Sequence, residues 1–390
     1  MDQLIRSLLW GTDRGRLGEL SLSVETDGTL KLERCWPGED LAMPELGQDA
    51  VLGGSLMAMS FERCVQGIGS PRSGRLDWVR GNPYASIFLP VAVALSSRAD
   101  LSFQSNGASL GQSYRDGEPV EPIRRAPGGQ EAKLRLDLQL DSRLLGGEVP
   151  AYPFKIRASE LVCLLPGLQV ALQYKGFRPL NFRCQNGMAD LLELYVPVEE
   201  RLHPEPFSFE TREGEVGYRC SVFLTRSEME RIKSFASLEE THLGGVHEDL
   251  LRRVVQDVVR MHKIDIPVRR QSYDNVASSR MSYFGTSGVI VPFRREAHQG
   301  EFMGTIPGLA AAVHVNSAGL EWETNYRARL VGPEMLLENV RPQLHNEFQR
   351  WVLEHPEAIH VWAAQWLQQE KRPRRKRPAP LEAPKDPGSE

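Results

Sequence analysis

Six cations stand close together near the C-terminus, where Lys371–Arg377 reads Lys-Arg-Pro-Arg-Arg-Lys-Arg. A cluster of this kind attracts phosphate backbones without reading base sequence. Residues 371–390 are rich in Pro and poor in apolar side chains, so we expect disorder there. A solvated terminus without a role is the other interpretation, and the sequence leaves both open. The candidate DNA contacts are Lys371, Arg372, Arg374, Arg375, Lys376 and Arg377.

Other residue types that do chemistry lack the spacing of a known site. His242, His247 and His262 are too far apart in the sequence to indicate a metal site, so we expect structural histidines. Gly67 and Gly69 are too sparse for a phosphate-binding loop or a dinucleotide fingerprint. No Gly-x-Ser-x-Gly segment is present to indicate a serine nucleophile. These residues alone therefore predict neither a metal nor a reaction class.

The composition is that of a globular protein, with 41% hydrophobic and 25% charged residues. Five dispersed cysteines without a C-x-x-C pair are typical of reduced thiols and predict a cytoplasmic location. The net charge is −4, and because residues 371–390 carry +4, residues 1–370 carry −8. An acidic body does not attract nucleic acid by bulk charge. No segment approaches the roughly 20 apolar residues of a membrane span, so we expect no membrane partner and no signal peptide.

Alternation of apolar and polar residues predicts β-strands in the first half of the chain. One hairpin is expected at Glu19–Arg34 around an Asp-Gly turn, and another at Asp100–Tyr114 around an Asn-Gly turn. A further strand is expected at Ala132–Leu140. The apolar segment Ala85–Ser97 fits a buried helix or a buried strand, because its periodicity does not distinguish them.

Helical patterns are interspersed with these strands and dominate the end of the chain. Short helices are expected at Leu161–Leu168 and Met188–Tyr195, and an amphipathic helix at Glu248–His262. A long helical stretch, Glu334–Gln369, is expected to break at Pro342 and at Pro356.

A linker composition at Val196–Pro206 separates two groups of elements. A further strand is expected at Ala310–Val315. This order predicts two α+β domains joined by a short connection. The residues expected in the two cores are Ile87, Val91 and Leu95 in the first, and Val254 and Val258 in the second.

Four longer segments carry recognisable landmarks. They are LSSRADLSFQSNGASLGQSYRDGEP at Leu95–Pro119, FRPLNFRCQNGMADLLELY at Phe177–Tyr195, SFASLEETHLGGVHEDLL at Ser234–Leu251, and the segment Glu323–Pro356. In type, order and spacing they resemble the B subunit of bacterial DNA gyrase and topoisomerase IV, the type IIA topoisomerases. The third segment is similar to the transducer signature of that family, and the fourth to its Gln-Thr-Lys loop and following helix.

The resemblance implies a fold and a domain order. We expect a Bergerat-type (GHKL) ATPase-like α/β sandwich over residues 1–197, of the α+β class. A ribosomal-S5-like transducer domain is expected over residues 203–370, followed by the basic tail 371–390. The family's toprim domain, which carries the metal-binding carboxylates for DNA cleavage, is expected to be absent. The family's dimer arm would lie upstream of Met1.

The positions that the resemblance assigns to nucleotide chemistry are replaced. In the family a Glu activates water and an Asn four residues later holds magnesium; here these positions hold Gln3 and Ser7. Gln has no basic carboxylate, and the Ser hydroxyl is too short to replace the amide. The family's Asp that recognises adenine is Arg34 here, and a guanidinium cannot accept a hydrogen bond from the adenine amino group.

The phosphate lid implied by the resemblance is also altered. Its family form is rich in Gly because backbone amides must approach the phosphates closely. Pro83 has no amide hydrogen to offer, and Phe88 adds bulk. The phosphate-sensing Lys falls on Arg327, which keeps the charge and changes its shape. The positions of the lid glycines hold Asn82, Pro83, Ser86 and Phe88.

The sequence thus predicts a gyrase-B-like pseudo-ATPase that serves as a scaffold or regulator in DNA topology. Neither ATP nor Mg²⁺, the cofactors of the family, is expected to bind. The alternative is the ATPase subunit of an ATP-dependent type II topoisomerase that works with a separate cleavage subunit, so the enzyme question stays open. A third interpretation is a small-ligand binder that has reused the nucleotide cleft. The partners expected are gyrase or topoisomerase IV subunits, duplex DNA through the tail, and a second copy of the chain.

Overall fold

Alternating side chains on the first hairpin send every second residue into the core. Strands β1 (Glu19–Val24) and β2 (Thr29–Trp36) pair antiparallel, as predicted. Gly28 has φ +86°, a conformation that glycine adopts without strain, and the Asp27 carboxylate accepts a hydrogen bond from the Thr29 amide. The computed structural model describes residues 18–36, 92–145, 151–213, 216–262, 264, 305–317, 320–323, 328–332 and 335–370.

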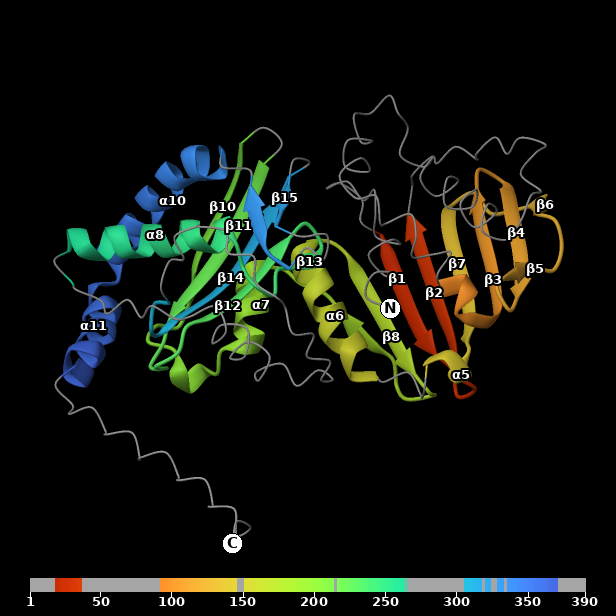
Figure 1. Ribbon diagram of the computed structural model, residues 1–390, viewed down its shortest axis with the longest axis horizontal. Helices are drawn as coiled ribbons and strands as arrows, with labels where there is room; N and C mark the ends of the chain where they lie inside the picture. The colour runs from red at the N-terminus through yellow and green to blue at the C-terminus, as the bar shows by residue number, and fades with distance from the viewer. Residues whose placement is uncertain are drawn as a thin grey trace, which may run out of the picture.

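The first sheet is built around this hairpin in the order β5-β4-β3-β7-β2-β1-β8-β9, with β6 paired to β4 (Figure 1). Strand β8 runs parallel to β1, and the other neighbours are antiparallel. The second predicted hairpin is confirmed as β3 and β4. The remaining strands are β3 (Ser96–Ser105), β4 (Ala108–Arg115), β5 (Glu118–Pro119), β6 (Arg124–Pro127), β7 (Ala132–Leu140), β8 (Gln169–Tyr174) and β9 (Leu180–Phe182).

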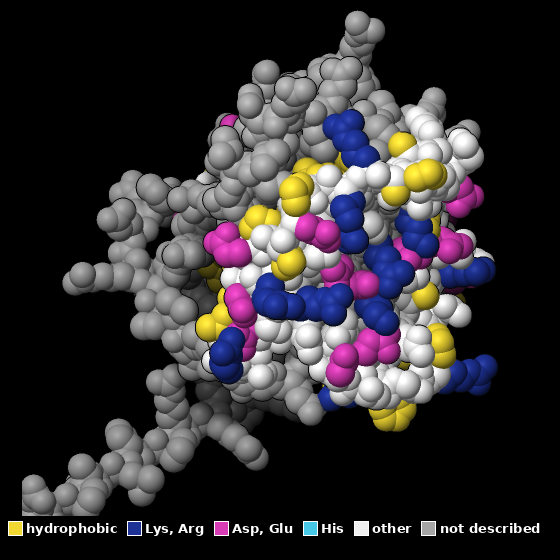
Figure 2. All heavy atoms as spheres, turned by 90° about the vertical axis from the view of Figure 1, so that its right-hand side faces the viewer, with side chains coloured by type: hydrophobic (Ala, Val, Ile, Leu, Met, Phe, Trp, Pro, Cys, Tyr) yellow, Lys and Arg dark blue, Asp and Glu magenta, His cyan; other side chains and the backbone are white. Residues whose placement is uncertain are grey.

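The two faces of this sheet differ in chemistry. One face is apolar and packs on helix α6, while the other carries ion pairs between neighbouring side chains. Two of these pairs are Lys133–Glu33 at 2.6 Å and Arg98–Asp100 at 2.9 Å. Figure 2 shows Lys and Arg side chains interleaved with Asp and Glu at the end of the molecule that carries β4 to β6. Because positive and negative side chains are interleaved, the described part of this face has no positive patch that would attract a nucleic acid.

Two helices lie between the first sheet and a second sheet (Figure 1). Helix α6 (Ala151–Leu164) packs on β8 and β9, and α7 (Met188–Tyr195) packs on β11 and β14 of the second sheet. The prediction for α7 is confirmed. The prediction of a helix at Leu161–Leu168 is wrong: α6 begins ten residues earlier, and it ends before Pro166 and Gly167, whose φ is +95°. A short helix, α5 (Ser142–Leu145), and a 3₁₀ turn, η2 (Val198–Glu200), complete this part.

The second sheet has the order β10-β11-β14-β12-β13, in which β12 and β14 run parallel. Both of its faces are covered, so β14 is buried along nearly its whole length, as the apolar run Ala310–Val315 predicts. Its strands are β10 (Phe207–Glu213), β11 (Val216–Leu224), β12 (Arg231–Ala236), β13 (Glu239–Glu240) and β14 (Leu309–Asn316).

Helices α8 (Val246–Met261) and α10 (Met335–Glu354) cover the far face of the second sheet (Figure 1). Val254 and Val258 are fully buried there, as predicted. The expected break at Pro342 is wrong, because α10 continues through it. Buried side chains on both sides of the proline hold this helix against the sheet: Val340, Leu344 and Phe348.

Helix α11 (Pro356–Glu370) starts at Pro356, a position that tolerates proline because its amide would have no helical partner. Its Trp362 is fully buried and donates its indole N–H to the Pro307 carbonyl at 3.1 Å. A two-stranded sheet of β15 (Glu321–Trp322) and β16 (Leu330–Gly332) lies beside α8.

The described residues up to Val196 are called the first unit here, and those from Phe207 onward the second unit. The burial predicted for one core residue of the first unit is wrong. Leu95 is only half-buried, because it lies in the turn between the short helical segment 92–94 and β3. Ala92 and Val93 are buried instead. Ile87 and Val91 lie outside the described residues.

Candidate functional site

Arg34 lies in the middle of the first sheet, on the covered face of β2. The residues beside it are Leu20 on β1 and Leu134 on β7, and its side chain is 0% exposed. Its guanidinium carbon lies 5.4 Å from the centre of the Trp36 ring, two residues along the same strand and on the same face. An aromatic face stabilises a cation in this position. The sequence-predicted residue is therefore a buried cation that can donate hydrogen bonds and cannot accept them.

Arg34 is the one predicted site residue that lies within the described residues, and the others lie outside them. They are Gln3, Ser7, Asn82, Pro83, Ser86, Phe88, Arg327 and the tail cations Lys371, Arg372, Arg374, Arg375, Lys376 and Arg377.

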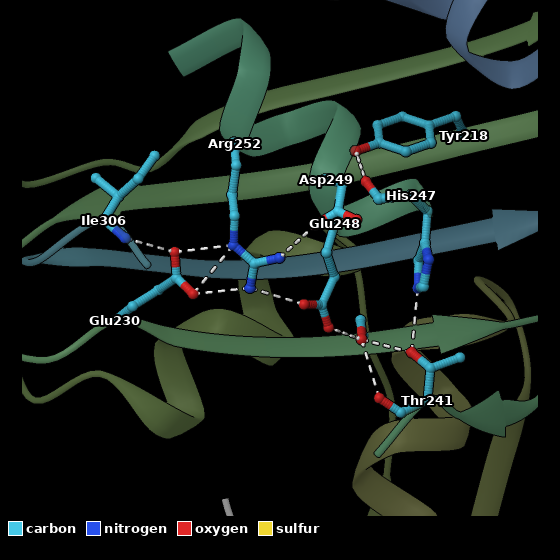
Figure 3. A network of polar contacts seen from close by, with 9 residues as sticks. Tyr218, Glu230, Thr241, His247, Glu248, Asp249, Arg252 and Ile306 are labelled. Atoms are coloured by element: carbon cyan, nitrogen blue, oxygen red, sulfur yellow. Dashed lines mark hydrogen bonds and ion pairs between the residues drawn. The ribbon is translucent and has the colours of Figure 1, made fainter. Parts of the chain in front are cut away.

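Four residues of the segment Ser234–Leu251 converge on one buried network in the second sheet (Figure 3). The Ser234 hydroxyl donates to the Glu248 carboxylate at 2.5 Å and contacts the Thr241 hydroxyl at 2.5 Å. The Thr241 hydroxyl contacts Nε2 of His247 at 3.1 Å. Tyr218 on β11 donates its hydroxyl to the backbone carbonyl of His247 at 3.0 Å. The network thus joins β11, β12 and the start of α8.

Arg252 extends this network into a buried ionic centre. Its guanidinium donates to Glu230 at 2.7 Å, to Glu248 at 2.9 Å and to Asp249 at 3.0 Å (Figure 3). Glu230 also accepts the backbone amide of Ile306 at 2.9 Å. Burial alone would lower the pKa of Arg252, but the charges of Glu230 and Glu248 raise it well above its ordinary value. Burial raises the pKa of Asp249.

This centre holds the fold together and does not present an open catalytic group. Both carboxylate oxygens of Glu248 are engaged, one by Ser234 and one by Arg252. Among the described residues, no group of His, Cys, Asp and Glu is arranged to hold a metal ion. Sequence reasoning missed Glu230 and Arg252. The signal for Arg252 was present, because a cation four residues after Glu248 interrupts the apolar face of α8.

Two glycines allow α8 to start at this point. Gly244 has φ +73° and Gly245 has φ +147°, and a Cβ at Gly245 would lie 2.2 Å from the Leu330 carbonyl oxygen. The Leu330 amide donates to the Gly244 carbonyl at 3.1 Å. Only glycine fits such a close backbone approach, so β16 is held against the N-terminus of α8.

A second polar cluster joins the two sheets through Glu160 of α6. Its carboxylate accepts from Arg157 at 3.0 Å on the same helix and from Lys233 of β12 at 2.8 Å. The Tyr195 hydroxyl at the end of α7 donates to it at 3.2 Å. Lys233 also pairs with Glu240 at 2.7 Å. Arg157 also donates to the backbone carbonyl of Leu238, which lies in the second unit.

A further contact between the units lies at the end of α6. Arg219 of β11 donates to the Leu164 carbonyl at 2.6 Å and contacts Nδ1 of His314 at 2.8 Å. The other ring nitrogen of His314 contacts the Ser237 carbonyl at 2.8 Å. The last turn of α6 is thereby capped by a side chain of the second sheet.

The three histidines named in the sequence are separated in the structure. His247 is buried in the network of Figure 3, and His262 lies at the C-terminal end of α8. The exposed His242 lies 3.5 Å from Glu240.

Comparisons with known proteins show which sequences and folds this chain is similar to. No family model matches the chain. It is 21% identical over 273 residues to the DNA gyrase B protein of Staphylococcus epidermidis, a match that covers 68% of this chain and 38% of that protein. The gyrase B protein of Myxococcus xanthus superposes with a TM-score of 0.63 at 19% identity, over 93% of this chain and 91% of that one. The 43K ATPase domain of Thermus thermophilus gyrase B gives 0.60 at 18% identity, over 94% and 86%.

The fold is therefore that of a GHKL-type ATPase region of the α+β class, as predicted. In sequence and in fold, the chain is similar to the gyrase B proteins of the type IIA topoisomerases. It spans about two fifths of the length of the curated relative named above. Within the described residues, no helix has the length and apolar content to cross a membrane.

The ionic centre at Arg252 leads to a first prediction. Replacing Arg252 with Leu leaves Glu230, Glu248 and Asp249 buried without their shared cation. We expect the free energy of unfolding to fall by about 3–5 kcal/mol in urea denaturation. Arg260→Leu, an exposed position on the same helix, is the matched control and should change it by less than about 0.5 kcal/mol. Equal effects of the two variants would show that the centre does not stabilise α8.

The cluster around Glu160 and Lys233, to which Glu240 belongs, leads to a prediction on pH. Burial alone would raise the pKa of Glu240, but hydrogen bonds and charge from His242 and Lys233 lower it to about 2, from an ordinary value of 4.5. A depressed folded-state pKa contributes stability above pH 4.5 that is lost as the pH falls toward 2. The stability difference between wild type and Glu240→Gln should therefore be present at about pH 5 and shrink as the pH falls below 4.5.

Chemical denaturation at a series of pH values measures this difference. Glu210→Gln, at an exposed position on β10, controls for the removal of one carboxylate. A difference that grows as the pH falls below 4.5 would contradict the assignment.

Proposed function

We propose that the chain is a gyrase-B-like pseudo-ATPase that acts as a binding scaffold or regulator in DNA topology. The observation that carries this proposal is Arg34, at the position where the resemblance places the Asp that recognises adenine. Arg34 is fully buried in the first sheet, with Leu20 and Leu134 beside it on the neighbouring strands. A group that only donates hydrogen bonds cannot accept one from the adenine amino group.

The sequence changes at the other nucleotide positions support the same proposal. Gln3 lacks the carboxylate that would activate water, and Ser7 lacks the amide that would hold magnesium. Pro83 removes one backbone donor from the lid. We infer that ATP and Mg²⁺ are not cofactors of this chain, and that its role is to bind partners.

The second unit also fits a binding role. In its described part the buried acids are already engaged by Arg252, Ser234 and Lys233, which leaves them poor candidates for acid–base chemistry. The partners we propose are gyrase or topoisomerase IV subunits, duplex DNA through the tail, and a second copy of the chain. We place this activity in the cytoplasm.

Nucleotide binding tests the proposal directly. Titration of the full chain with ATP in the presence of magnesium should give no heat of binding at millimolar nucleotide. Gln3→Glu alone should produce no turnover, because the adenine and magnesium contacts would still be missing. Steady magnesium-dependent ATPase activity that is lost in Gln3→Ala, and kept in the exposed control Gln130→Ala, would refute the proposal. That result would identify an active ATPase subunit.

DNA binding should depend on the basic tail. Its six clustered cations can neutralise several phosphates, which predicts a steep loss of affinity with salt and no sequence preference. Deleting residues 371–390 should abolish most duplex binding in fluorescence anisotropy and leave the melting temperature unchanged. A tail with the same residues in shuffled order is the matched control and should bind as wild type does.

The competing source of positive charge is the segment 263–296, which carries Arg269, Arg270, Arg294 and Arg295. If the truncated chain binds duplex DNA with the same affinity and the same salt slope, this segment is the contact and the tail is not.

A further inference from the structure

Strand β9 forms one edge of the first sheet. It is the last strand in the sheet order and pairs antiparallel with β8 through Leu180, Asn181 and Phe182. No strand in the described part of the chain pairs with its other side. The backbone N–H and C=O groups that point away from β8 can therefore pair with a strand from another molecule.

Apolar side chains are exposed along this edge. Leu180 is 40% exposed, and Phe177, in the turn before β9, is 70% exposed. Phe182 lies on the same face of the strand as Leu180 and packs against the first core. Phe182 thus anchors β9 to the sheet, while Leu180 and Phe177 present apolar surface beside the free edge.

The turn after β8 holds this edge in a fixed place. Lys175 has φ +45° and Gly176 has φ +75°, a combination that suits a tight β-hairpin turn. The Phe177 amide donates to the Tyr174 carbonyl at 2.9 Å, and the Lys175 amide donates to the Val24 carbonyl at 2.6 Å. Because the turn is already ordered, a binding partner loses less of its affinity to ordering the edge.

Positive charge accumulates in the same segment. Residues 161–189 contain three cations, Lys175, Arg178 and Arg183, and no Asp or Glu. The next acid along the chain, Asp190, accepts backbone amides of the loop before α7 at 2.9 and 3.0 Å. The β9 edge is therefore locally basic, although the body of the protein is acidic as a whole.

Arg178 and Arg183 flank β9 at its two ends, and both are exposed. Within the described part of the chain, neither forms an ion pair. Glu25, which follows the Val24 carbonyl beside the turn, is paired with Lys31 at 3.0 Å. The two arginines are therefore available to an anionic partner.

These cations also determine which kind of strand can join the edge. Two copies of β9 side by side would bring like charges together, which is destabilising. Charged side chains, together with a proline such as Pro179, are a common protection of an edge strand against pairing with itself. A strand that carries carboxylates meets the same cations with opposite charge, so the edge discriminates in favour of an acidic partner.

We propose that β9 is a docking edge for an extended acidic peptide of a partner protein, which joins the first sheet as an additional strand. The peptide backbone pairs with the free edge of β9, its carboxylates pair with Arg178 and Arg183, and its apolar side chains cover Leu180 and Phe177. In this mode of binding, main-chain hydrogen bonds provide affinity and side chains provide specificity. The proposal does not depend on whether the chain binds nucleotide.

The test uses the full chain and a fluorescein-labelled peptide, Glu-Val-Glu-Val-Glu-Val, in fluorescence anisotropy. We expect a dissociation constant below about 1 mM, which weakens as salt is added. The peptide Lys-Val-Lys-Val-Lys-Val should not bind. The acidic peptide with methylated backbone nitrogens should not bind either, because it cannot pair with a strand. Equal binding of the methylated and unmethylated peptides would show attraction by charge alone and would overturn the proposal.

Two variants locate the charge contact. The double variant Arg178→Glu with Arg183→Glu should lower the affinity by about tenfold or more, because two favourable pairs become repulsive. Arg260→Glu, at an exposed position on α8, is the matched control and should bind as wild type does. Unchanged affinity in the double variant would place the peptide elsewhere, the basic tail included, and would refute a docking edge at β9.

Hydrogen–deuterium exchange on the wild-type chain locates the backbone contact without any variant. The acidic peptide should slow exchange at the amides of Leu180, Asn181 and Phe182, and unchanged exchange there would contradict the proposal. A fluorescein-labelled oligothymidylate tests the competing class of partner. If it binds wild type and loses affinity in the double variant, while the acidic peptide does not bind, the edge is a nucleic-acid contact and the proposal is wrong.

Discussion

The pairing of Glu160 with Lys233 is the constraint on which the arrangement of the two units depends. A carboxylate and an ammonium are buried together at 2.8 Å, one on a helix of the first unit and one on a strand of the second. Removing either group would leave the other charged and buried, which costs several kcal/mol. Arg157 and Tyr195 fill the remaining positions around the Glu160 carboxylate. The two sheets therefore contact each other through a cluster that neither completes alone.

Strand β12 connects this cluster to the interior of the second unit. Its side chains alternate, so Lys233 faces α6 while the neighbouring Ser234 faces α8 and donates to Glu248. A shift of one residue in the pairing of β12 with β14 would exchange these two side chains. Both networks would then lose a partner at once. Residues of the segment Ser234–Leu251 thus specify the register of the strand.

Local patterns predicted the parts of the fold whose signal lies within a few residues. Strict alternation predicted the β1–β2 hairpin, and the apolar face of α8 predicted the burial of Val254 and Val258. The start of α6 was missed because its first turns have no apolar stripe that local periodicity could detect. The pairs Glu160–Lys233 and Glu230–Arg252 were missed for another reason. Each joins residues far apart in the sequence, and no pattern within either segment indicates the partner.

At the candidate site, the family resemblance suggested a role for position 34, and the structure shows which residues surround Arg34 there. The cation stands between Leu20 and Leu134 and over the Trp36 ring, so the protein itself stabilises the charge. An aspartate at this position would place an anion in the same apolar row and would lose the favourable contact with the ring. The packing around position 34 has therefore adapted to a cation. Replacing Arg34 with Asp would therefore put a carboxylate at a fully buried sheet position whose neighbour Trp36 favours a cation.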